Sequence, residues 1–372
     1  MSGRAQPENG KGGGGRRLPP LLRDVTLWRQ LGRTYALSVI AGAIAVWAGI
    51  PLPWMLGPFF AWAAMSLMGL RPTLMPMGRE LGQVAIGVVV GMRFTLPLLL
   101  ATMSLLPAMF LGTIYVILLT MSAAVLFGWL ARVDHVTAFF ATAAGGVADM
   151  ARVAQKFGGV TQSVAVVHAL RVACVVGLVP FIVVFLGERG TPPLIADEVT
   201  GTVWLVPVAL LLGYLGARAL KPTPIPNPWL VGPIFVGMAL GISGVFHVHV
   251  PGVVIVVAQI ALGTWLGAQF RREQLGALPR VTAAGLAISL YLVVGAALGA
   301  WVFSAATGVA FTTAFLGFAP AAVTEMVLVA KFMDLEAEIV TAFHVLRIAI
   351  VASTVLLVFR LYGKLRGVRL EP

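Results

Sequence analysis

A short stretch occurs twice in this chain, and each copy places a helix-breaking sequence and an acid inside strongly apolar surroundings. The copies are residues 139–150, FFATAAGGVADM, and residues 315–326, FLGFAPAAVTEM. A His-x-x-Arg pair follows each copy at the same distance. The ionisable residues are Asp149, His168 and Arg171 in the first copy, and Glu325, His344 and Arg347 in the second. Because ionisable groups in a membrane segment are costly and mark functional sites, the fold has to bury and satisfy both sets.

The break comprises residues 143–146 in the first copy, with Gly145 and Gly146, and residues 319–322 in the second, with Pro320. Glycine permits positive φ and close backbone approach, whereas proline lacks an N–H group and disfavours a helical conformation at the preceding residue. We therefore predict two half-helices around each break. The second half-helix would begin with backbone N–H donors and a positive dipole end, which suit an anion. The alternative is a helix kink with a packing role alone.

The composition indicates a membrane protein. Hydrophobic residues make up 59% of the sequence and charged residues 11%, whereas soluble proteins have about 45–50% apolar and about 25% charged residues. The basic residues behind the net charge of +12 lie mostly between apolar runs and at the two ends, as in cytoplasmic loops. We therefore expect the lipid bilayer, and no nucleic acid, as a partner. The single cysteine, Cys174, lies in an apolar run and is expected to be a small core residue.

Further landmarks repeat at nearly the same spacing as the hairpin sequences, which indicates an internal duplication. The repeated residues are Gln83, Gly87 and Gly91 with Gln259, Gly263 and Gly267, and a Pro-Trp-x-x-Gly-Pro sequence at 53–58 and 228–233. Small residues four apart on one helix face predict close helix packing. The two glutamines either join this packing or face a central cavity.

The duplication predicts five segments along the chain. They are a disordered basic arm (1–33), a first membrane repeat (34–188), a linker (189–201), a second membrane repeat (202–360) and a basic cytoplasmic tail (361–372). The arm is rich in glycine, arginine and proline, and such a composition cannot form a hydrophobic core.

The positions of the basic residues decide the orientation of the repeats. If the broken segment of each half enters and leaves on one side, each half has an odd number of crossings and the second half is inverted. Most basic residues then lie in the cytoplasm, whereas crossing by every segment would leave several of them outside, against the positive-inside rule. We therefore predict an all-α polytopic membrane protein with two inverted-topology repeats, about ten transmembrane helices plus two re-entrant (broken-helix) hairpins, and both termini in the cytoplasm.

The two acids need partners at membrane depth. We expect Arg171 to pair with Asp149, and Arg347 to pair with Glu325, each from the helix that follows its hairpin. The histidine of each His-x-x-Arg pair shares a helix face with its arginine and can carry a proton near physiological pH. The alternative is a static ion pair that holds the hairpin in place.

Two further histidines, His247 and His249, have the spacing of metal ligands, but no carboxylate or thiol cluster accompanies them. The sequence also contains no Ser/His/Asp arrangement, no phosphate-binding glycine loop and no dinucleotide fingerprint. We therefore predict no metal, no cofactor and no enzymatic activity.

The hairpin sequence with its downstream His-x-x-Arg pair resembles the AbrB family of bacterial inner-membrane proteins, whose usual pattern is Ala-Pro-Gly-Gly-x-x-Glu-Met. The resemblance covers residues 34–360. The first copy departs from the pattern at Ala144 and Asp149, and the second at Ala321 and Ala322. The resemblance implies a location in the inner (plasma) membrane, and its members carry the labels ammonia monooxygenase and regulator of gene expression. The two copies need not be equivalent.

The leading hypothesis is a secondary transporter of a small polar or anionic solute, coupled to protons. The site would use the two acids and the two His-x-x-Arg pairs, together with Gly145, Gly146, Pro320, Gln83 and Gln259. The alternative is a membrane sensor that regulates gene expression by binding the same solute without transporting it. A membrane monooxygenase fits least, because no metal or organic cofactor site is visible. The sequence leaves open the solute, the coupling ion and whether the chain forms a homo-oligomer.

Overall fold

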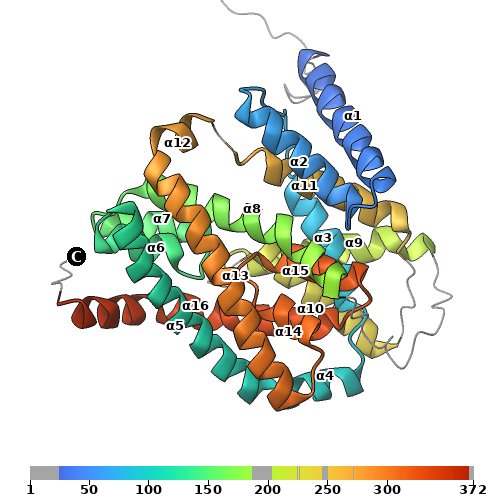
Figure 1. The fold of residues 1–372 in the computed structure, drawn as a ribbon. Helices are drawn as coiled ribbons and strands as arrows, with labels where there is room; N and C mark the ends of the chain where they lie inside the picture. Colours follow the sequence, from blue (N-terminus) through green and yellow to red (C-terminus); the bar gives the residue numbers. More distant parts are fainter. Residues whose placement is uncertain are drawn as a thin grey trace, which may run out of the picture.

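The computed structural model describes residues 25–186, 203–223, 225, 227–244, 250–270 and 272–367. All regular secondary structure in this part of the chain is helical, as predicted (Figure 1). Five of the helices are long and apolar enough to cross a membrane, or up to six if the bent pair α3–α4 counts as one span. Together with the composition, these helices identify a multi-pass membrane protein.

The helices of the first half have counterparts in the same order in the second half. The first half contains α1 (Val25–Trp47), α2 (Pro53–Leu67), α3 (Gly78–Gly91), α4 (Leu96–Ser104), α5 (Leu106–Ala131), α6 (His135–Thr142), α7 (Val147–Lys156) and α8 (Thr161–Leu186). The second half contains the 3₁₀ turn η2 (Val203–Leu205), α9 (Val206–Leu220), α10 (Pro228–Ser243), α11 (Gly252–Gly267), α12 (Arg272–Ala277), α13 (Pro279–Thr307), α14 (Phe311–Phe318), α15 (Val323–Phe332) and α16 (Ala337–Leu365).

Two of the predicted segment boundaries need correction. Helix α1 begins at Val25, so the end of the predicted arm (1–33) is helical. Arginines do not stop this helix because Arg29 and Arg33 lie on its exposed face, while Leu31 is buried. At the other end, α16 continues to Leu365, into the predicted tail. The predicted linker (189–201), residues 1–24 and residues 368–372 lie outside the described residues.

The helices group into two bundles, and each bundle takes equivalent helices from both halves (Figure 1). The first bundle contains α1, α2 and α3 with α9, α10 and α11. The second bundle contains α5 to α8 with α13 to α16. In the first bundle α2 packs on α11 and, at the equivalent place, α10 packs on α3. In the second bundle α5 and α13 pack on each other, and each half's hairpin packs on the helix that follows it.

The predicted glycine packing is confirmed, and it holds the first bundle together. A Cβ atom at Gly263 would lie 2.2 Å from the backbone oxygen of Met55. At the equivalent place, a Cβ atom at Gly87 would lie 2.8 Å from the backbone oxygen of Leu230. Both distances are below van der Waals contact, so only glycine allows the backbones of α11 and α2, and of α3 and α10, to approach this closely.

Candidate functional site

Each repeated stretch forms the predicted pair of half-helices. Helix α6 ends at Thr142 and α7 begins at Val147, while α14 ends at Phe318 and α15 begins at Val323. The backbone at the two breaks is nearly the same, with φ −52° and ψ 142° at Ala143, and φ −54° and ψ 132° at Ala319. The break is therefore a shared feature of both copies despite their different sequences.

The glycines of the first break do not use the positive φ that glycine allows. Gly146 has φ −67°, and its counterpart Ala322 has φ −74°; neither Gly145 nor Gly146 is among the described residues with positive φ. Because these backbone angles suit any residue, Ala321 and Ala322 replace the glycines in the second copy without strain. Gly145 instead provides space, since a Cβ atom there would lie 2.6 Å from the Met150 side chain.

The His-x-x-Arg pair of α8 binds the open carbonyl end of α6. His168 Nε2 lies 2.9 Å from the backbone oxygen of Phe140. Arg171 Nη1 donates to the backbone oxygens of Thr142 and Ala143 over 3.1 and 2.9 Å. The last carbonyls of a helix have no partner within the helix, and unpaired polar backbone groups are costly at membrane depth. The pair therefore satisfies the end of the first half-helix.

The second copy repeats this arrangement and adds further contacts. His344 Nε2 lies 2.9 Å from the backbone oxygen of Leu316. Arg347 Nη1 donates to the backbone oxygens of Gly317 and Ala319 over 3.2 and 3.0 Å, and Nη2 donates to that of Ala321 over 3.3 Å. The His-x-x-Arg pair is thus a carbonyl cap for the broken helix in both halves.

The caps fix the tautomer of both histidines. In each pair an arginine Nη2 lies close to the histidine Nδ1, at 3.0 Å for His168 and 2.7 Å for His344. Arginine can only donate, so Nδ1 accepts and the ring proton lies on Nε2, which donates to the backbone oxygen. Both ring nitrogens are therefore engaged in the uncharged form. This disfavours the proton-carrying role that the sequence suggested for His168 and His344.

The predicted pairing of the arginines with the acids is wrong, because the guanidinium groups bind backbone carbonyls instead. Asp149 pairs with Arg152 on its own helix, over 3.5 Å, and both side chains are exposed. Glu325 makes no ion pair with Arg347 in the described part of the chain. Each arginine does contact the hairpin that the sequence spacing predicted. It binds the backbone carbonyls of the break rather than the acid, because buried backbone carbonyls require donors.

The two acids occupy different environments. The side chain of Asp149 is 59% exposed, whereas Glu325 is only 6% exposed and its Oε2 atom has no hydrogen-bond partner among the described residues. Helix α15 is buried along most of its length, while α7 presents its charged residues on an exposed face. A buried carboxyl with an unpartnered oxygen is a candidate proton or ligand site.

Gln83 connects the two bundles beside this acid. Its Nε2 atom donates to Thr324 Oγ1 over 3.2 Å, and both residues are buried. Gln259, the counterpart of Gln83, is also buried. Thr324 is the residue before Glu325, so α3 meets α15 at the acid.

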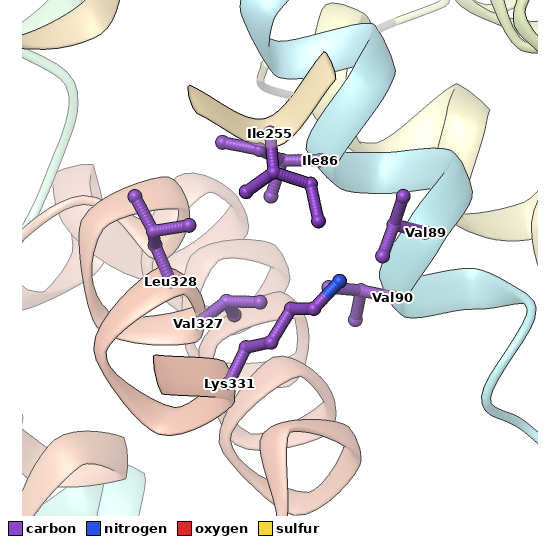
Figure 2. Close-up of a pocket in the computed structure, with 7 residues that line it drawn as sticks. All are labelled: Ile86, Val89, Val90, Ile255, Val327, Leu328 and Lys331. Carbon is purple, nitrogen blue, oxygen red and sulfur yellow. The ribbon is translucent and has the colours of Figure 1, made fainter. Parts of the chain in front are cut away.

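A crevice continues along the same contact between the bundles (Figure 2). Its walls are Ile86, Val89, Val90, Ile255, Val327, Leu328 and Lys331. The crevice is too narrow for a water molecule. The side chain of Lys331 extends from α15 toward α3, with its nitrogen beside Val90 (Figure 2). Sequence analysis assigned no role to Lys331, although a lysine in an apolar run six residues after Glu325 is itself a signal of a functional site.

A second small space lies at the first break. It has a volume of about 20 Å³ and its lining includes Thr120, Ala143, Ala144 and Thr354. This is room for about one water molecule. No group of three or more potential metal ligands occurs among the described residues, and His247 and His249 lie outside them.

The fold and the site define a class: an all-helical, multi-pass membrane protein built from two duplicated halves, each with a broken helix capped by a His-x-x-Arg pair. The profile of the AbrB family, described as "Transition state regulatory protein AbrB", matches residues 54–363. The chain belongs to this family, as the resemblance predicted.

Two relatives match over most of their length. "Uncharacterized protein YhjN" of Bacillus subtilis (strain 168) is 26% identical, over 89% of this chain and 93% of the relative. "Putative regulator AbrB" of Escherichia coli (strain K12) is 22% identical, over 86% of this chain and 92% of the relative.

Proposed function

We propose that the protein is a secondary transporter of a small polar or anionic solute, coupled to protons. The observation that carries the proposal is the buried Glu325, whose unpartnered oxygen lies at the start of a broken helix where two bundles meet. Broken helices at the interface of repeats form the substrate and ion sites of many transporters. A buried acid with one carboxyl oxygen that has no partner among the described residues suits reversible protonation.

We further propose an inverted topology with about ten crossings and two re-entrant hairpins, located in the inner membrane with both termini in the cytoplasm. Two observations support it. Each bundle contains equivalent helices of both halves, as expected for repeats related by a two-fold axis, which lies in the membrane plane if the repeats are inverted and along the membrane normal if they are parallel. The basic residues fall mostly on one side only in this topology.

Transport in this scheme proceeds by rocking of one bundle against the other. The two hairpins support this mechanism because they differ in exposure. Helix α3 packs on α15, whereas the equivalent helices α11 and α7 have at most a marginal contact. Val323, at the start of α15, is 1% exposed, while its counterpart Val147 is 40% exposed. These features correspond to one end state, closed at the second hairpin and open at the first.

Glu325 would carry the coupling proton in this state. Asp149 would take the equivalent position in the other end state, in which α11 packs on α7 and α3 separates from α15. The His-x-x-Arg pairs would keep the broken helices intact during the change. The histidine Nε2 and arginine Nη1 atoms are engaged by backbone groups, and only the Nε of each arginine has no partner among the described residues. We therefore assign the pairs to holding the site rather than to binding the solute.

The alternative is a sensor that regulates gene expression, which the name of the Escherichia coli relative favours. A sensor would bind the solute at the same site and pass the signal to a partner. Deletion of residues 1–24 separates the two functions, because it removes a basic arm and leaves α1 intact. Loss of regulation with unchanged solute binding would favour the sensor.

The transporter is tested by solute uptake and proton flux in proteoliposomes, with a panel of carboxylates, amino acids and ammonium. The variants are Glu325→Gln and Asp149→Asn, and Glu273→Gln is the matched control because Glu273 forms an exposed ion pair with Arg71. We expect Glu325→Gln to abolish proton-coupled flux and Glu273→Gln to leave it unchanged. Absence of flux for the whole panel in the wild type would contradict the proposal.

A further inference from the structure

The partners that the interior cations already have limit where a solute anion can bind. Arg171 and Arg347 donate through their Nη atoms to backbone carbonyls and a histidine, and only the buried Nε of each arginine has no partner among the described residues. Arg79 lies over the ring of Trp265, with its guanidinium carbon 4.1 Å from the centroid. Lys331, by contrast, makes neither a hydrogen bond nor an ion pair with any of the described residues. The Lys331 side chain is half-buried, and a partly desolvated ammonium without such a partner favours an anion as a ligand.

The crevice beside Lys331 restricts the kind of anion. Apart from the lysine, all of its lining residues are aliphatic: Ile86, Val89, Val90, Ile255, Val327 and Leu328. An aliphatic wall with one cation suits a molecule that carries a single negative charge at one end and an apolar chain at the other. A phosphate or a dicarboxylate would leave charges against the aliphatic wall, which is costly.

We propose that the crevice between α3 and α15 is the recognition site for a small aliphatic monocarboxylate, with Lys331 as the group that binds the carboxylate. This inference rests on the proposed function, for which it names the substrate class. The crevice lies on the contact between the two bundles. Rocking of the bundles would therefore open it, which explains why a site for an organic molecule is closed in this conformation.

The position of Glu325 supplies a reason for proton coupling. It lies six residues before Lys331 on α15, or about 9 Å along the helix axis. Two negative charges this close repel each other strongly where water is excluded. A carboxylate bound to Lys331 therefore favours the protonated form of Glu325, so that anion and proton would move together.

A neighbouring acid offers a competing explanation for Lys331. Glu338, in the first turn of α16, is buried, and its charge acts on Lys331, as does that of Arg93. Glu338 and Lys331 form no ion pair within the described residues. If Lys331 served only to balance Glu338, removal of either charge would reduce stability and neither would change the affinity for a carboxylate.

The test measures binding by isothermal titration calorimetry with the full-length protein in detergent. The probes are propanoate, butanoate and hexanoate, with butanamide as the uncharged match for butanoate. The variants are Lys331→Met, which removes the charge and keeps the length, Lys331→Arg, which keeps the charge, and Glu338→Gln. Gln155→Met is the matched control, because Gln155 occupies the position in α7 equivalent to Lys331.

We expect the wild type to bind butanoate and not butanamide. Lys331→Met should weaken butanoate binding about 30-fold or more, as expected for loss of one partner of a buried charge pair. Lys331→Arg and Gln155→Met should retain most of the affinity, and Glu338→Gln should leave it unchanged or raise it. Equal binding of butanoate and butanamide, absence of carboxylate binding, or unchanged affinity in Lys331→Met would overturn the inference. The wild-type comparison of the two probes does not depend on the folding of any variant.

Flux measurements with the same proteins separate this inference from the proposed function. Transport of other solutes without carboxylate binding would leave the transporter standing and refute the Lys331 site. Carboxylate binding that depends on Lys331, without flux of any carboxylate, would support the site and refute transport.

Discussion

Arg347 donates to His344 Nδ1 over 2.7 Å, and the two side chains together bind the carbonyl end of α14. Because His168 and Arg171 do the same for α6, the most regular feature of the duplication is a structural cap. The breaks that create a site in a membrane also leave backbone carbonyls without partners, and the chain satisfies both breaks with the same pair of residues.

The cap predicts that Arg347→Met is strongly destabilising. The variant leaves several buried carbonyl groups without donors, and each such group costs about 1–3 kcal/mol. We expect the free energy of unfolding to fall by about 3 kcal/mol or more, measured as a lower melting temperature in detergent. Arg152→Met is the control, since Arg152 is exposed and pairs only with Asp149; its effect should stay within about 0.5 kcal/mol. Equal stability of the two variants would show that the carbonyl cap contributes nothing.

The fixed tautomers predict that the histidines are not the proton carriers. In His168→Gln and His344→Gln an amide can still donate to the backbone oxygen that the imidazole bound. Proton flux per solute in proteoliposomes should therefore be retained in both variants, with a reduced rate at most. Glu325→Gln should lose the proton flux. If either histidine variant transports the solute without protons while Glu325→Gln stays coupled, the assignment is reversed.

Much of the fold and part of the site could be predicted from the sequence. The helical breaks at 143–146 and 319–322, the glycine contacts of α3 and α11, and the pairing of each His-x-x-Arg with its own hairpin follow from local residue types repeated at one spacing. The start of α1 was misplaced because arginines on an exposed helix face resemble a disordered basic segment.

The partners of the ionisable residues could not be predicted. A sequence shows that an arginine and an acid belong to neighbouring helices, but it does not show how many backbone carbonyls compete for the same guanidinium. It also assigns the same role to Asp149 and Glu325, which the structure separates into an exposed residue and a buried one. That difference arises from the packing of α3 on α15, a tertiary contact that the repeat itself does not determine.

The glycine contacts predict an unequal response to alanine. Gly263→Ala places a methyl group against the backbone oxygen of Met55, so α11 and α2 must separate. We expect a loss of about 1–3 kcal/mol in stability, as for overpacked cores. Gly276→Ala is the control, because a Cβ atom there has no neighbour within 4 Å. Thermal unfolding of both variants in detergent tests the difference. If Gly263→Ala has no effect on stability, α11 and α2 lie further apart than in this structure.

The inequivalent hairpins predict different accessibility at equivalent positions. In a Cys174→Ala background, Val147→Cys should react readily with a charged, water-soluble thiol reagent, because Val147 is exposed beside the exposed ion pair of Asp149 and Arg152. Val323→Cys should react at least about tenfold more slowly, since the reaction requires a local opening that costs 1.4 kcal/mol or more. A transported solute should change both rates in opposite directions. Equal rates in the absence of solute would contradict the asymmetry of the two hairpins.

Gln83 and Thr324 join the bundles through a hydrogen bond of 3.2 Å, which predicts that linking α3 to α15 stops transport. Gln83→Cys and Thr324→Cys would be combined in the Cys174→Ala background and treated with a short, reducible thiol cross-linker. We expect cross-linking to abolish solute flux and a reductant to restore it, because the bundles must separate at this contact for the second hairpin to open.

Gln259→Cys with Ala148→Cys is the matched control at the equivalent position of the first hairpin. This pair should cross-link much less, since α11 and α7 have at most a marginal contact. Full transport by the cross-linked Gln83/Thr324 protein would show that the two bundles do not move apart at this contact during transport.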